Sequence, residues 1–136
     1  MKNPDKDLLQ EYQEKISEFL VIDELNMKDK QMELPGARHY WVGRLMHHKQ
    51  EILKLQRAKT QALVMLRQKI EGESPVMLNH KTIHSSINSH EVIQKIDQEI
   101  AKNELYVDYL TRVEANFRDA QYGLNNLTKI ITLETT

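Results

Sequence analysis

Three histidines in the second half of the chain have the spacing of metal ligands. His80 and His84 are four residues apart and would share one face of a helix, and His90 follows nearby. Imidazole is a common ligand of Zn²⁺, but a site needs a third ligand that converges on the same point. Because the surrounding residues are rich in Ser and Asn, we interpret this stretch as a polar loop and predict no metal site. His47 and His48 are adjacent and would point in different directions on a helix.

Basic residues concentrated in one segment are the second group that could carry chemistry. Eight lysines and arginines lie from Arg38 to Lys69 against a single acid, Glu51, so this segment carries about +7 whereas the whole chain carries −1. A cationic strip of this kind can bind a phosphate backbone, where electrostatics independent of base sequence supply most of the affinity. The same residues could instead solvate a surface and pair with acidic residues elsewhere in the chain.

A long helix predicted over residues 37–71 positions these basic residues. Its start follows Pro35-Gly36, and its apolar seam repeats at alternating spacings of four and three, which keep one face toward a partner helix. The seam consists of Trp41, Leu45, His48, Ile52, Leu55, Lys59, Ala62, Leu66 and Lys69. At about 1.5 Å per residue the helix would be roughly 50 Å long, so it needs a partner of comparable length.

Lys59 and the aromatic pair Tyr40-Trp41 are the informative positions on this seam. An uncompensated ammonium is costly to bury, so we expect the seam to open at Lys59 to solvent, an acidic partner or a ligand. Tyr40 and Trp41 could stack on bases, but a Trp at the first position of a seam is more typical of a core residue.

The partner of this helix is a second long helix predicted over residues 91–131. An amphipathic helix with an acidic side is expected over 3–21, a connector over 21–36, and a loop over 72–90, with a short helix around 76–83 as the alternative. Two long helices joined by a loop of this length fold back as an antiparallel hairpin. We therefore predict a single all-α domain consisting of a long antiparallel helical hairpin with a short N-terminal amphipathic helix.

Apolar residues off the main seam indicate self-association. Met46, Leu53 and Met65 lie away from it, and a two-helix hairpin buries only one stripe per helix. Another copy of the chain is the simplest source of a second contact. We place the contacts of this homo-oligomer on the C-terminal helix, at Leu124, Leu127 and Ile131.

The composition excludes several classes of function. The chain has no cysteine, so disulfides and thiolate metal sites are ruled out, and a reducing compartment is expected. It contains no glycine-rich phosphate loop, no Ser-His-Asp arrangement and no HExxH motif, so we expect no catalytic residues, no cofactor and no enzymatic activity. No stretch approaches eighteen uninterrupted apolar residues, and we expect a cytoplasmic protein without a membrane partner.

A series of residues in one order and spacing covers most of the chain. It comprises Ile22, Asp23, Leu25, Pro35, Tyr40, Trp41, Lys49, Glu51, Leu53, Lys59, Ala62, Leu63 and Gly72, then Ser89 to Ile93, Val107 to Leu110, and Asn116, Arg118, Gln121 and Asn126. In this pattern the chain resembles the UvsY family, the recombination mediators of tailed bacteriophages. The resemblance implies a small helical protein in the host cytoplasm that forms a ring-like homo-oligomer and binds single-stranded DNA. It also implies loading of a RecA-like phage recombinase onto strands coated with the phage single-strand-binding protein.

The resemblance also indicates where DNA would bind. A short basic segment of the long helix is implicated in the family, and here it falls on residues 63–67. Val64 and Leu66 stand where basic residues would be expected, so the prediction moves to the neighbouring cations. The candidate nucleic-acid-binding residues are Lys54, Arg57, Lys59, Arg67 and Lys69.

Two alternatives of other classes remain open. One is a non-enzymatic helical adaptor whose basic face binds only acidic protein partners. The other is a small metal-dependent enzyme built on His80, His84 and His90.

Overall fold

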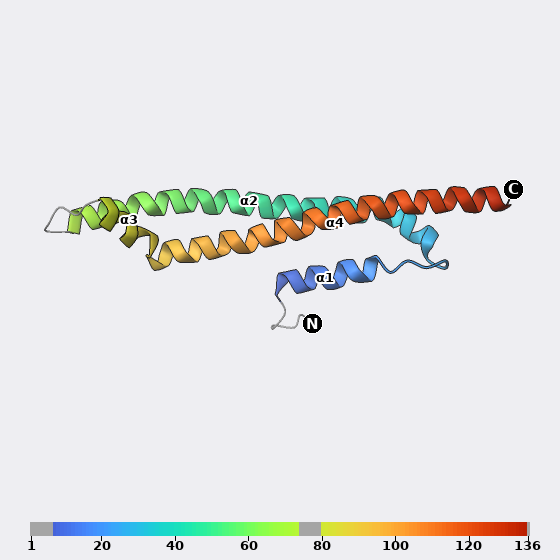
Figure 1. Cartoon of the computed structure of the whole chain (residues 1–136), viewed down its shortest axis with the longest axis horizontal. Coiled ribbons are helices and arrows are strands. Elements are labelled where there is room, and N and C mark those ends of the chain that lie inside the picture. The colour runs from blue at the N-terminus through green and yellow to red at the C-terminus, as the bar shows by residue number, and fades with distance from the viewer. Residues whose placement is uncertain (1–6, 74–79, 136) are drawn as a thin grey trace. The chain divides into compact units, whose positions relative to one another are not determined.

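Four α-helices make up most of what the computed structural model describes, which is residues 7–73 and 80–135 (Figure 1). Within these residues there is no strand, so the prediction of an all-α protein is confirmed. None of the described helices is long and apolar enough to cross a membrane. The helices are α1 (Leu8–Phe19), α2 (Met27–Glu73), α3 (His80–Asn88) and α4 (Glu91–Thr135).

Contacts within the chain divide it into two compact units, where we expected one domain. Unit 1 consists of Met1–Arg44 and Leu110–Thr136, and unit 2 of Leu45–Tyr109, so α2 and α4 each contribute to both. In a pair of long antiparallel helices, each residue contacts only the residues of the partner helix that lie opposite it. Contacts between the helices therefore fall into separate groups along their length.

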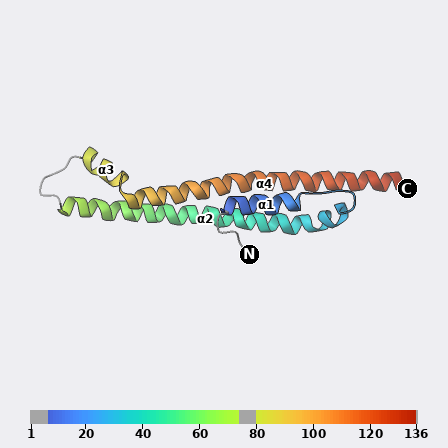
Figure 2. The ribbon, with the colours of Figure 1, turned by 90° about the horizontal axis from the view of Figure 1, so that it is seen from below.

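The two long helices are antiparallel in each unit, as predicted (Figure 1 and Figure 2). In unit 1, Gln31 hydrogen-bonds Asn125, whereas Arg38, later in α2, contacts Glu114, earlier in α4. Unit 2 has the same order, because His48 bonds to Asn103 and Lys59 to Asp97.

Aromatic side chains join α1 to both long helices in unit 1. The Asp7 carboxylate caps α1 by accepting from the Gln10 amide, whereas the predicted start at Asn3-Pro4-Asp5 lies outside the described residues. Tyr12 packs edge-to-face on Trp41 of α2, with ring centroids 5.2 Å apart. The core of this unit comprises Tyr12, Ile16, Leu34, Trp41, Leu110, Val113, Phe117 and Leu124.

The expected connector over 21–36 is wrong, because α2 begins at Met27 and continues through Pro35. Asp23 and Asn26 start the helix reciprocally, since each side-chain oxygen accepts from the other's backbone amide. The spacing of four and three continues from Trp41 back through Leu34 to Gln31. Leu34 is completely buried, and this burial offsets the loss of the backbone hydrogen bond that the proline removes. The first turns of α2 are inclined to the turns that follow (Figure 1), as expected at an internal proline.

The expected loop over 72–90 contains the helix α3. Ile83 and Ile87, four residues apart, are buried with Ile93 of α4 and pack against an α2 surface made of Ala62, Leu63, Leu66 and Ile70. The Ser89 hydroxyl donates to the carbonyls of Ser85 and Ser86 and so satisfies the end of α3. A Ser-rich segment needs only this two-residue stripe to form a helix when a neighbouring helix covers it. The alternative helix over 76–83 begins in residues that are not described.

Candidate nucleic-acid interface

The arginines of α2 in unit 1 are held by partners on other helices. Arg38 donates from Nε and Nη2 to Glu114 Oε1, at 2.9 and 2.6 Å, and Nη1 lies 3.5 Å from Gln121. Arg44 donates to the Tyr12 hydroxyl at 3.1 and 3.2 Å. The charge of Arg38 is thus compensated by Glu114, and Arg44 is held by Tyr12. Both arginines therefore contribute to the packing of unit 1.

Lys59 of unit 2 has an acidic partner on α4. Its Nζ lies 2.7 Å from Asp97 Oδ1, and its side chain is one-third exposed. Of the three outcomes expected for a lysine on the seam, the acidic partner is the one the structure shows. The charge of Lys59 is therefore already compensated, which makes it the least available of the predicted phosphate contacts.

The other four predicted cations are exposed on α2 in unit 2. Lys54 and Arg67 form pairs within the helix, at 3.4 Å to Glu51 and 3.3 Å to Glu71, which a solvated phosphate could exchange at little cost. Arg57 and Lys69 make no ion pair with any described residue. Of the five predicted cations, Lys54, Arg57, Arg67 and Lys69 are therefore exposed, and we call these four the cationic surface of unit 2.

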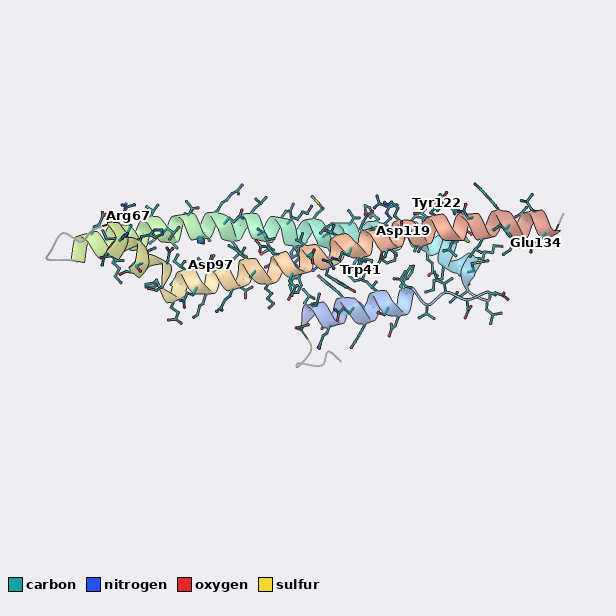
Figure 3. All side chains as sticks on the ribbon, viewed as in Figure 1. Trp41, Arg67, Asp97, Asp119, Tyr122 and Glu134 are labelled. Atoms are coloured by element: carbon teal, nitrogen blue, oxygen red, sulfur yellow. The ribbon has the colours of Figure 1, made fainter. Side chains whose placement is uncertain are left out.

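A cavity of about 300 Å³ lies between α3 and the part of α2 that carries Arg67. It is lined by Arg67 of α2 and by Lys81, Ile83, His84 and Ile87 of α3. Figure 3 marks Arg67 on the part of α2 that contributes to it. Lys81 was missed, and His84 was considered only as a metal ligand, because the segment was interpreted as a loop. The signal that could have found them is the Ile83/Ile87 pair, which defines a helix on which Lys81 and His84, three residues apart, are neighbours.

One member of the aromatic pair is available for stacking. Trp41 is buried against Tyr12, as expected for a core residue, whereas Tyr40 is 54% exposed and packs on it edge-to-face. Tyr40 belongs to unit 1, and the cationic surface defined above belongs to unit 2.

His48, His84 and His90 make hydrogen bonds within the protein. His48 is buried with its Nδ1 2.9 Å from Asn103 Oδ1. His90 Nδ1 accepts from the Val92 amide at the start of α4, and His84 Nε2 accepts from the Asn88 amide nitrogen. The His80 side chain lies outside the described residues. No three His, Asp or Glu side chains that are described converge as metal ligands would.

The predicted oligomer contacts separate into two kinds. Leu124 is 3% exposed and already belongs to the core of unit 1, so it is not available to another subunit. Leu127 and Ile131 are about half exposed, at 48% and 44%, and Ile130 and Leu133 are exposed beside them on α4.

The structure explains one of the two apolar residues, Leu66, at positions where the resemblance led us to expect basic ones. The Leu66 side chain packs against the α3 cluster of Ile83 and Ile87, where a charged group would be costly. Val64 is 53% exposed, and no described contact explains the apolar residue at that position.

These features define an all-α protein made of antiparallel long helices with an exposed cationic helix surface. Its fold is that of the bacteriophage T4 recombination mediator protein UvsY. Three crystal forms of that protein match with TM-scores of 0.79, 0.77 and 0.74, each at 13% sequence identity. The matches cover 94%, 96% and 91% of this chain and 99%, 100% and 98% of the other. Neither a protein-family model nor a curated protein sequence matches the chain.

Proposed function

We propose that the protein is a recombination mediator that binds single-stranded DNA and helps to load a RecA-like phage recombinase. The recombinase would be loaded onto strands coated with single-strand-binding protein, in the host cytoplasm and without a reaction catalysed by the mediator itself. The observation that carries this proposal is the likeness to UvsY over almost the whole length of both chains.

The exposed cations of unit 2 support DNA binding on independent physical grounds. Lys54, Arg57, Arg67 and Lys69 would neutralise phosphates and release counterions whichever bases are attached. Nothing among these residues resembles a constellation that reads base edges. Binding should therefore be nearly indifferent to base sequence and should weaken as salt rises.

Fluorescence anisotropy with a labelled single-stranded oligonucleotide at a series of salt concentrations tests this proposal. The logarithm of the affinity should fall with a slope of about −0.7 for each phosphate contacted. The charge reversal Arg57→Glu with Lys69→Glu should weaken binding and flatten this slope. The matched control, Lys95→Glu with Lys102→Glu on exposed positions of α4, should do much less.

The outcomes separate the alternatives. Equal weakening by the two double variants would overturn the assignment to α2. Absence of salt-dependent binding by the unaltered protein would favour the helical adaptor that binds only protein. Loading itself is tested by following assembly of a RecA-like recombinase on a strand coated with single-strand-binding protein, with and without this protein.

Self-association is part of the same proposal. Leu127, Ile130 and Ile131, at i, i+3 and i+4, form an exposed apolar face on α4 that another copy of the chain could cover. Light scattering should show an oligomer that dissociates when Leu127→Asp is combined with Ile130→Asp, because two charges would then have to be buried. Asn126→Asp adds a charge to an exposed position of the same helix and should leave the assembly intact. A folded monomer of the unaltered chain would contradict this prediction.

A further inference from the structure

The cavity between α2 and α3 in unit 2 combines cationic walls with a fixed apolar base. Ile83 and Ile87 are buried in the cluster with Ile93, and this packing holds α3 against residues 62–70 of α2. Lys81 and His84 flank Ile83 on the same helix, and Arg67 approaches from α2. Core packing therefore sets the position of the α3 backbone that carries Lys81 and His84.

Donors dominate the polar lining of this cavity. Lys81 has no ion pair or hydrogen bond with a described residue, and the described lining residues include no carboxylate. An amide nitrogen can only donate, so the Asn88 contact fixes His84 Nε2 as the acceptor and leaves the ring proton on Nδ1. Arg67 is about half exposed, and its ion pair with Glu71, at 3.3 Å, lies on an exposed turn of α2.

A second, shallower depression continues from Lys81 along α3. Thr82, Ser85, Ser86 and Ser89 line it, and its volume is about 430 Å³. The Ser89 hydroxyl already donates to the Ser85 and Ser86 carbonyls, so the relevant hydroxyl groups are those of the other residues. Hydroxyls and lysines are among the groups that proteins use most often on phosphate and sugar oxygens. Because Lys81 lines both depressions, a polyanion that occupies the first can continue into the second.

We infer that α3 is a phosphate-binding element in which Lys81 and His84, together with Arg67, hold a phosphodiester of single-stranded nucleic acid. The hydroxyl-lined depression, which Lys81 also lines, takes the next phosphate. This inference rests on the proposed DNA binding and adds a second helix to the DNA-binding surface. A flexible chain fits this site better than a duplex, because its phosphate can turn inward without disrupting base pairs.

The test is the binding of a fluorescent oligothymidylate to the full-length protein carrying Lys81→Gln with His84→Gln. We expect weaker binding and a salt slope shallower by about 0.7 for each phosphate that the variant no longer neutralises. Lys81→Arg keeps the charge and should keep the slope. Lys95→Gln with Lys102→Gln removes charge from exposed positions of α4 and should have little effect. Since Lys81 and His84 are exposed, helicity and thermal stability should not change.

Lysine acetylation provides a measurement that does not depend on a variant. Bound oligothymidylate should protect Lys81 from acetylation while Lys95 reacts at its free rate, as read by mass spectrometry. If the unaltered protein binds and the Arg57→Glu with Lys69→Glu variant is impaired, but the α3 variant binds normally and Lys81 stays reactive, the inference is overturned and the proposed function stands. If the unaltered protein does not bind, both are overturned.

Discussion

Units 1 and 2 are built on the same two helices but are held together by different side chains. Unit 1 has an aromatic core in which Phe19 meets Phe117 with ring centroids 5.6 Å apart. Unit 2 has an aliphatic cluster around Ile93 and a buried polar pair, His48 and Asn103. Aromatic residues bury more area for each residue fixed, so unit 1 should be the more stably packed of the two.

The same contrast applies to the charges on α2. In unit 1, Arg38 and Arg44 are bound by Glu114, Gln121 and Tyr12. In unit 2, Lys59 has an acidic partner on another helix, whereas Arg57 has none among the described residues. The net charge of a helix therefore does not locate a binding surface, because neighbouring helices decide which cations remain available.

The comparison of the two cores is tested first by Phe117→Ala. Phe117 is completely buried, so its removal should lower the free energy of unfolding by about 3 to 5 kcal/mol, and Ile93→Ala in unit 2 by about 2 kcal/mol. Denaturant titration followed by circular dichroism measures both. Tyr122→Ala, at a position 71% exposed on the same helix as Phe117, should change stability by less than about 0.5 kcal/mol. If Phe117→Ala and Ile93→Ala lowered the free energy of unfolding equally, unit 1 would not be the more stably packed unit.

The buried polar pair of unit 2 is tested by Asn103→Leu. The amide nitrogen of Asn103 donates to the Glu99 carbonyl, so its oxygen is the acceptor for His48 Nδ1. Loss of this acceptor should cost about 1 to 3 kcal/mol of unfolding free energy. Adding His48→Leu should restore part of the loss, because both polar groups are then replaced by apolar ones. A double variant as unstable as the sum of the single changes would show that the pair does not act as a unit.

The smallest expected effects distinguish Arg38 from Arg57. Arg38→Gln should lower stability by about 1 kcal/mol, because it breaks a partly exposed ion pair with two donors, and should leave DNA affinity unchanged. Arg57→Gln should leave stability unchanged and lower DNA affinity. Thermal melts and anisotropy on the same samples provide both readouts. The reverse pattern would place the DNA contacts on unit 1.

Local patterns in the sequence predicted the long helices because helix geometry is local. The spacing of four and three from Trp41 to Lys69 identified most of α2, and Glu91 was expected as the start of the C-terminal helix. The beginning of α2 was missed because Pro35-Gly36 is usually a stop, and only the burial of Leu34 shows what outweighs it. α3 was missed because nine residues with two isoleucines carry too little periodicity by themselves.

By itself the sequence determined that the protein is helical, that eight of its 19 lysines and arginines are concentrated in one helical segment with a single acid, and that a lysine on the seam needs a partner. These properties follow from residue types and from the 3.6-residue repeat of the helix. Only the tertiary structure decided that Asp97 is this partner, that Leu124 is an internal core residue, and that Lys81 and His84 lie beside Arg67. Such contacts join residues far apart in the chain, so they depend on how helices pack and no local pattern contains them.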